Sequence, residues 1–153
     1  DDFNFRVSKA GGKIYFDNDI HLKYFVRGTY PGLWRQFFQY GYWKVFVNKK
    51  HKTITSIRQL APFGFVSYIF LFLLSLIFLR EYFHITVMPL ILYILLTTYF
   101  SIKLSKKRYE MINLFKSFFI LHFSYGLGYL EGAFNFIILN KNDVSVKNEK
   151  LSR

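Results

Sequence analysis

Two long apolar runs without any charged residue constrain the fold of this chain more than any other feature. They cover residues 59–79 and 85–102, and only the short segment 80–84 lies between them. A helix of about 20 predominantly apolar residues is long enough to cross the hydrocarbon layer of a membrane. The sequence therefore predicts two transmembrane helices, 59–79 and 85–102, joined as a hairpin.

Positively charged residues lie on one side of this predicted hairpin. They precede the first run and follow the second, whereas segment 80–84 carries almost no net charge. Lys and Arg are enriched in the cytoplasmic flanks of membrane helices. We therefore expect both ends of the hairpin in the cytoplasm and 80–84 outside, in a multi-pass protein of the cell inner membrane that contacts membrane lipids.

The overall composition is also typical of a membrane protein. Aromatic residues make up 22% of the chain, and Trp and Tyr are enriched at the interface between lipid and water. The net charge of +12 does not indicate nucleic-acid binding, because the basic residues gather beside apolar runs and not over a polar face. The chain has no cysteine, which excludes disulfides and thiolate metal sites. It does not begin with Met, so we expect its natural start to lie upstream.

Residues 31–58 connect the predicted hairpin to the N-terminal part of the chain. Within them, the segment 33–44 mixes two Trp, two Tyr and two Phe with four polar or charged residues. Pro31 suits the first turn of a helix, where its missing N–H costs nothing. Such a helix is too polar to span a membrane and too aromatic to lie free in water. We therefore predict an amphipathic helix in the membrane interface, followed by a basic linker.

The hydrophobic segment 109–139 has two interpretations. From residue 112 onward it contains Lys116, His122 and Glu131, and small residues recur along its second half. It forms either a third membrane span packed tightly through its glycines, or two shorter interfacial or re-entrant pieces that break at 125–128. The polar tail 140–153 is expected to be disordered, and its basic residues slightly favour the second interpretation.

The first thirty residues have the pattern of a soluble α/β enzyme. Residues 1–10 predict a short helix that stops at Gly11, and 13–16 and 20–26 predict two strands around a turn at 17–19. One helix and two strands cannot bury a core of their own. We therefore expect them to pack against parts of a protein that lie outside this chain.

Two motifs in this N-terminal part carry a resemblance. They are Asp-Asp-Phe-Asn-Phe-Arg at 1–6 and Lys-Ala-Gly-Gly-Lys-Ile-Tyr-Phe-Asp at 9–17. Together they resemble the end of the catalytic domain in family 2 glycosyltransferases, in particular the membrane-anchored enzymes of exopolysaccharide (succinoglycan-type) synthesis. The resemblance implies that residues 1–30 are the α/β end of a GT-A type nucleotide-sugar domain. In the family register the catalytic base would immediately precede Asp1, and Asp1 and Asp2 would be its neighbours.

A second motif, Gln-Phe-Phe-Gln-Tyr-Gly at 36–41, is similar to the Gln-x-x-Arg-(Trp/Tyr) element of the same family. That element lies on an interface helix and lines the acceptor and donor-diphosphate end of the site. Gln39 stands where Arg is usual, so either a nearby cation supplies the missing charge or the element mainly positions the acceptor. The resemblance assigns acceptor and diphosphate binding to Arg35, Gln36, Gln39, Tyr40, Trp43 and Lys44.

A third motif, His-x-x-Tyr-Gly-x-Gly at 122–128, resembles a segment near the end of the same group of enzymes. It carries no chemical role that we can assign. For the stretch 122–132 we favour close helix packing through small residues over a polar or lipid-headgroup contact. The three motifs occur in the order in which the family has them.

The resemblance implies that the chain is the C-terminal portion of an inverting glycosyltransferase and is inactive alone. The complete enzyme would transfer a sugar from a nucleoside-diphosphate sugar to a saccharide or polyprenyl-linked acceptor in cell-surface polysaccharide synthesis. A divalent metal, Mg²⁺ or Mn²⁺, would be bound by residues outside this chain, and the catalytic part would be cytoplasmic. The alternative is a small non-enzymatic protein that anchors at a membrane or binds a partner.

Overall fold

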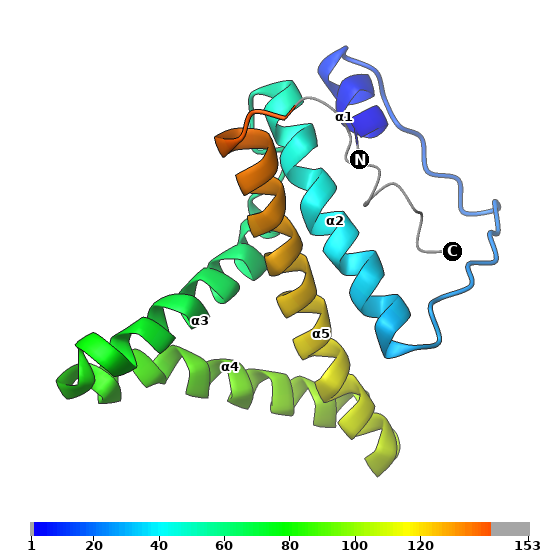
Figure 1. The fold of residues 1–153 in the computed structure, drawn as a ribbon. Helices are drawn as coiled ribbons and strands as arrows, with labels where there is room; N and C mark the ends of the chain where they lie inside the picture. Colours follow the sequence, from blue (N-terminus) through cyan, green and yellow to red (C-terminus); the bar gives the residue numbers. More distant parts are fainter. Residues whose placement is uncertain (1, 142–153) are drawn as a thin grey trace.

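The computed structural model describes residues 2–141, and helices dominate it (Figure 1). In chain order the helices are α1 (Asp2–Lys9), α2 (Tyr30–His51), α3 (Leu60–Phe78), α4 (Phe83–Leu104) and α5 (Arg108–Ala133). Three short helical turns precede α3, link α3 to α4 and extend α5; they are η1 (Ile57–Gln59), η2 (Arg80–Tyr82) and η3 (Phe134–Ile138).

Local signals explain where α1 begins and ends. Asp2 lies in its first turn, where the partial positive charge of a helix N-terminus favours an acid. Gly11 adopts a φ of +77°, and Gly12 N donates to the Val7 carbonyl oxygen at 2.9 Å. These features form a Schellman cap, which ends a helix. The predicted N-terminal helix is confirmed within the described residues, which do not include Asp1.

The predicted strands 13–16 and 20–26 are wrong. No strand occurs among residues 2–141, and the chain between α1 and α2 is an irregular connection along one side of the molecule (Figure 1). Its apolar side chains are largely exposed, with Tyr15 and Phe16 at 87% and 88%. A strand needs a neighbour that completes its backbone hydrogen bonds, and the described chain offers none.

The fold class therefore needs correction. Residues 2–30 comprise one helix and an irregular segment, so the described chain is all-helical and is not the α/β end of a GT-A domain. Only the predicted turn at 17–19 forms, where Asp19 N donates to Asp17 Oδ1 at 2.9 Å. That hydrogen bond is local and needs no partner strand.

Helices α2 and α5 run side by side in the same direction and form the centre of the molecule (Figure 1). Near their beginnings, Tyr30 Oη donates to Asn113 Oδ1 at 2.9 Å. Near their ends, Lys49 Nζ donates to the Phe136 carbonyl oxygen at 2.7 Å. Between these contacts the buried side chains form a small core, which consists of Tyr42, Val45, Tyr129 and Phe136. The predicted helix with Pro31 in its first turn is confirmed as α2.

Glycines determine how closely α5 approaches its neighbours. A Cβ on Gly128 would lie 2.0 Å from the Phe38 carbonyl oxygen of α2, and a Cβ on Gly126 would lie 2.4 Å from the Pro62 carbonyl oxygen of α3. Because no larger residue fits there, the predicted packing through small residues is confirmed. Helix α5 continues through 125–128, so the interpretation as two broken pieces is wrong.

The predicted hairpin corresponds to α3 and α4. With their adjoining turns they cover Ile57–Phe78 and Arg80–Leu104, and both are long and apolar enough to cross a membrane. They diverge from η2, and α4 leads the chain back to the beginning of α5 (Figure 1). Most of their large apolar side chains are exposed, and helices that are apolar all round are either buried or in contact with lipid.

Candidate functional site

A cavity of about 960 Å³ lies among α1, α2, the segment 55–59 and α5. Its lining combines aromatic rings, amides, hydroxyl groups and charged side chains; the residues are Asp2, Asn4, Phe5, Ser8, Gln39, Tyr40, Trp43, Lys44, Val47, Thr55, Ser56, Arg58, Gln59 and Tyr125. Segments that are far apart in the sequence therefore meet around one space.

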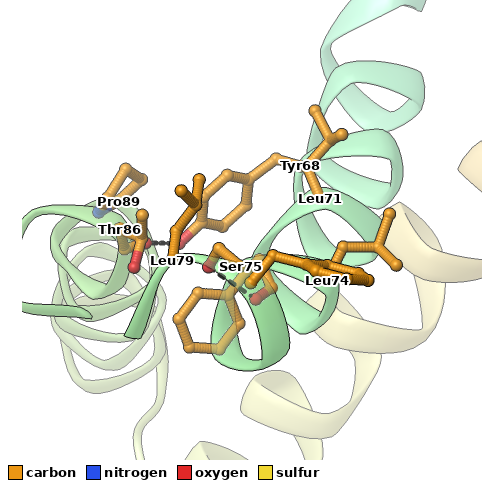
Figure 2. Close-up of a pocket in the computed structure, with 9 residues that line it drawn as sticks. Tyr68, Leu71, Leu74, Ser75, Leu79, Thr86 and Pro89 are labelled. Atoms are coloured by element: carbon orange, nitrogen blue, oxygen red, sulfur yellow. Dashed lines mark hydrogen bonds between the residues drawn. The ribbon is translucent and has the colours of Figure 1, made fainter. Parts of the chain in front are cut away.

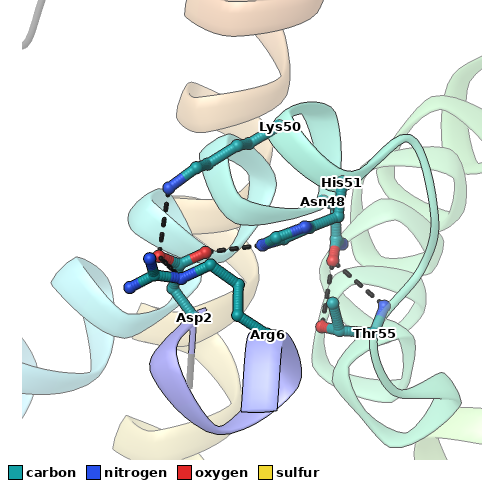
Figure 3. A network of polar contacts seen from close by, with 6 residues as sticks. All are labelled: Asp2, Arg6, Asn48, Lys50, His51 and Thr55. Atoms are coloured by element: carbon teal, nitrogen blue, oxygen red, sulfur yellow. Dashed lines mark hydrogen bonds and ion pairs between the residues drawn. The ribbon is translucent and has the colours of Figure 1, made fainter. Parts of the chain in front are cut away.

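The carboxylate of Asp2 attaches α1 to the end of α2 (Figure 3). One oxygen accepts a hydrogen bond from His51 Nε2 at 2.5 Å. The other accepts from Lys50 Nζ at 3.1 Å and lies 3.3 Å from Arg6 Nε. The ring of Phe5 packs on His51 with centroids 4.5 Å apart. These contacts fix the part of the cavity wall that α1 supplies.

The same contacts keep Asp2 ionised. The hydrogen bond from His51, with that from Lys50, lowers the pKa of Asp2 to about 2. Because a carboxylate only accepts hydrogen bonds, His51 must donate from Nε2. A carboxylate with so low a pKa is a poor general base near neutral pH. Asp2 therefore positions α1, whereas Asp1 lies outside the described residues.

A reversal of the chain after α2 brings the segment 55–59 to the cavity. Lys52 adopts a left-handed conformation with a φ of 52°. Asn48 Oδ1 then accepts hydrogen bonds from Thr55 N at 3.2 Å and from Thr55 Oγ1 at 3.1 Å (Figure 3). Asn48 Nδ2 donates to Tyr129 Oη at 3.3 Å, so the same side chain also connects α2 to α5.

Four of the residues predicted to bind acceptor or diphosphate line the cavity from α2; they are Gln39, Tyr40, Trp43 and Lys44. Their spacing of one, three and one residues places them on one face of a helix. Most of the residues predicted to bind acceptor or diphosphate therefore lie on one wall of the cavity.

Gln36 and Arg35 lie elsewhere. Gln36 is 9% exposed, and its Nε2 donates to Tyr40 Oη at 2.8 Å and to Tyr24 Oη at 3.2 Å. It therefore holds the Tyr40 hydroxyl group through this hydrogen bond and does not itself line the cavity. Arg35 is exposed and is not a lining residue, so among the alternatives for the missing charge Lys44 has the suitable position.

The cavity carries more positive than negative charge. Lys44 and Arg58 both line it, and partial burial lowers the pKa of the Lys44 ammonium. The negative charge of the lining residue Asp2 is paired with the ammonium group of Lys50. Positive groups beside a cavity favour an anionic ligand such as a phosphate.

Sequence reasoning missed several lining residues. By sequence, Gln59 is the first residue of an apolar run and Arg58 belongs to a basic flank, and neither pattern predicts a binding role. Phe5 and Tyr125 each belong to a recognised motif but received no role. For Tyr125, the third motif is the sequence feature that could have indicated a role. Gln59 and Arg58 reach the cavity because the chain reverses at Lys52, which the sequence pattern does not show.

The lining is chemically suited to a sugar that carries a negative group. Aromatic faces stack on the apolar faces of sugar rings, amides exchange hydrogen bonds with hydroxyl groups, and cations balance phosphate charge. Among residues 2–141 no three His, Asp or Glu side chains are grouped so that they could hold a metal ion. We therefore assign no metal-dependent step to the described residues.

A second cavity of about 360 Å³ lies between α3 and α4 near η2 (Figure 2). Its walls are mostly apolar, and two of its polar groups are already paired. Tyr68 Oη donates to the Thr86 carbonyl oxygen at 2.6 Å, and Ser75 Oγ donates to the Phe72 carbonyl oxygen at 2.7 Å. The hydroxyl group of the third polar residue, Thr86, donates to the Phe83 carbonyl oxygen at 3.1 Å, so we assign no chemical role to this cavity.

Comparisons with known proteins leave the site as the main guide to function. No family model matches the chain, and neither curated proteins nor solved structures give a match.

Proposed function

We propose that this chain is the membrane-associated C-terminal portion of a family 2 glycosyltransferase, and that the cavity among α1, α2 and α5 binds the saccharide end of its acceptor. The complete enzyme would transfer a sugar from a nucleoside-diphosphate sugar with inversion. Its acceptor would be a saccharide or a polyprenyl-linked saccharide in cell-surface polysaccharide synthesis. A divalent metal would be held by residues outside this chain.

One observation carries the proposal. Each of the three motifs that resemble the family supplies side chains to the same cavity: the first through Asp2 and Phe5, the second through Gln39 and Tyr40, and the third through Tyr125. The three motifs are separate in the sequence, at 1–17, 36–41 and 122–128. Their convergence on one space supports a common role in ligand binding.

The proposed roles follow from the chemistry of the lining. Trp43 and Tyr40 offer aromatic faces for a sugar ring, and Gln39 offers an amide for its hydroxyl groups. Lys44 and Arg58 balance the charge of a phosphate next to the sugar. Gln36 is a positioning residue, because it acts through its hydrogen bond to Tyr40.

The proposed membrane arrangement follows from the helices and the charges. Helices α3 and α4 would cross the inner membrane as a hairpin, with both ends and the catalytic part of the enzyme in the cytoplasm. Since α3 begins directly after the segment 55–59, the cavity would lie near the membrane surface. A lipid-linked saccharide presents its sugar at that depth.

An assay of sugar transfer by isolated membranes tests the proposal. The complete reading frame is expressed, and isolated membranes are incubated with a panel of radiolabelled nucleoside-diphosphate sugars and lipid extract. Wild-type membranes should label a lipid or saccharide product from at least one donor. Trp43→Leu should lower transfer roughly ten- to a hundredfold, since stacking and buried area together contribute about 1.5–3 kcal/mol.

Trp34→Leu is the matched control, because Trp34 lies on the same helix and also packs against a phenylalanine ring, that of Phe123 at 6.0 Å against Phe136 at 6.0 Å for Trp43, but does not line the cavity. It should retain transfer at matched protein levels. Failure of every donor with wild-type membranes would favour the non-enzymatic alternative. Equal transfer by the two Trp variants would overturn the proposed role of the cavity.

A further inference from the structure

Gln59 is a buried amide without a partner. It is 6% exposed, it lines the cavity among α1, α2 and α5, and it belongs to η1 just before α3. Neither its Nε2 nor its Oε1 has a hydrogen-bond partner in the described part of the chain. Its side chain does not cap α3.

Such an arrangement is unfavourable for the folded protein by itself. Burial removes the amide from water, and nothing in the described chain replaces the lost hydrogen bonds. Gln36 shows the usual solution, since its buried Nε2 donates to two tyrosine hydroxyl groups. A buried polar group that stays unpaired at a cavity wall is explained when a ligand supplies the missing partners.

We infer that Gln59 is a ligand-binding residue whose side-chain amide forms hydrogen bonds with two adjacent hydroxyl groups of a sugar ring. This inference rests on the proposed function and extends it by naming the group that recognises the saccharide. In this arrangement Nε2 donates to one hydroxyl oxygen, and Oε1 accepts from the neighbouring hydroxyl group. A pair of adjacent free hydroxyl groups is therefore required at that position of the sugar.

The surroundings of Gln59 fit a sugar better than a simple anion. Trp43 and Tyr125 line the same cavity and provide aromatic surface for a ring. A lone phosphate would need donors only, and the Oε1 of Gln59 is an acceptor. The cations Lys44 and Arg58 then serve a phosphate joined to that sugar, not the hydroxyl pair.

The other unpaired groups in the described chain do not lead to the same inference. They are Arg27 Nε and Ser101 Oγ. Neither residue lines the cavity among α1, α2 and α5.

The test is a binding titration with the full-length protein in lipid nanodiscs. The probes are the methyl glycosides of glucose, galactose and mannose, and isothermal titration calorimetry measures their binding. At least one glycoside should give a saturable binding curve, and its permethylated form should not. Gln59→Met should weaken the binding of that glycoside roughly tenfold or more, because two hydrogen bonds are lost.

A second readout separates a binding amide from a structural one. Gln59→Met should leave the melting temperature of the ligand-free protein unchanged or raise it, because it removes an unpaired buried amide. Gln36→Met is the matched control and should lower the melting temperature. If Gln59→Met lowers the melting temperature as much as Gln36→Met does, the inference is overturned.

The outcomes separate the inference from the proposed function. Wild-type affinity in Gln59→Met, with binding lost in Trp43→Leu, would overturn the role of Gln59 and leave the saccharide site intact. If no glycoside binds the wild-type protein, the saccharide site and the role of Gln59 are both overturned.

Discussion

The amide of Gln36 connects two parts of the chain, α2 and the irregular segment that precedes it. Its Nε2 donates to the hydroxyl oxygens of Tyr40 on α2 and of Tyr24 on the connection between α1 and α2. Tyr40 in turn lines the cavity among α1, α2 and α5. The orientation of a cavity residue thus depends on a side chain that does not itself line the cavity.

Replacement of Gln36 by Met should therefore destabilise the protein and alter the cavity. The loss of partners for the two tyrosine hydroxyl groups should cost about 1–3 kcal/mol of unfolding free energy. Tyr40→Phe should lower the unfolding free energy by part of this amount. The double variant with Gln36→Met and Tyr40→Phe should lower it by less than the sum of the two single variants, because the two residues share one hydrogen bond. Unfolding of the purified protein by denaturant measures all three variants. Strict additivity would contradict the described contact.

The sequence predicts cavity residues where the repeat of a single helix is enough to bring them together. Gln39, Trp43 and Lys44 share a face of α2 because the helix repeats every 3.6 residues. Periodicity also places Gln36 on this face, one turn before Tyr40, so only the structure shows that it is buried and does not line the cavity. Gln59 could not be foreseen, because its position depends on the left-handed turn at Lys52.

Helix α1 is attached to the rest of the molecule mainly through ionic contacts, and this makes its position sensitive to pH. The pKa of Asp2 is about 2 in the folded protein against a usual value of 3.8. A lowered pKa means that the ionised carboxylate stabilises docking above pH 3.8. This contribution is lost as the pH falls from 3.8 through 2.

Spin labels on Lys9 and Lys52 report this docking as a distance. In the wild-type protein the distribution of distances between the two labels should stay narrow above pH 4. It should broaden between pH 4 and 2, the range set by the usual pKa of Asp2, 3.8, and its lowered pKa of about 2. Asp2→Asn should be broad at neutral pH and show little further change. An Asp2→Asn protein with the narrow wild-type distribution would show that other contacts hold α1.

Close approach of α2 and α5 depends on residues without a side chain. Gly128→Ala would place a Cβ 2.0 Å from the Phe38 carbonyl oxygen, so one backbone must move. The expected loss is about 1–3 kcal/mol or more of unfolding free energy. Gly64→Ala in α3 is the matched control, because no atom lies within 4 Å of its Cβ position. Thermal unfolding in detergent should separate the two variants, and similar melting temperatures would contradict the described packing.

Helices were more predictable than strands for a physical reason. A helix such as α2 satisfies its backbone hydrogen bonds within itself, and its first turn is marked by Pro31. A strand requires a neighbour, and the alternation in 13–26 carries no information on whether one exists. The resemblance to a GT-A domain implied such a neighbour, which the described chain does not contain.

At the scale of the whole molecule, the hairpin of α3 and α4 returns the chain to the beginning of α5. Both helices are long and apolar enough to cross a membrane. Basic residues flank the open end of the hairpin, whereas η2 contains Arg80 beside Glu81. The charges thus favour an arrangement with the open end in the cytoplasm.

Cysteine labelling in intact cells measures this arrangement directly, since the chain has no cysteine of its own. Phe83→Cys at the turn should react with a membrane-impermeant reagent. Ser105→Cys should react only after the membrane is opened. The reverse pattern would contradict the proposed topology.

The central claim is that the cavity among α1, α2 and α5 binds a saccharide. Photocrosslinking with a lipid-linked saccharide that carries a diazirine on its terminal sugar tests it most directly, with mass spectrometry of the full-length protein to locate the adducts. We expect adducts on residues from α1, α2 and η1 together, including Trp43, and we expect excess unlabelled saccharide to suppress them. Adducts confined to the apolar cavity between α3 and α4, or none that competition suppresses, would contradict it.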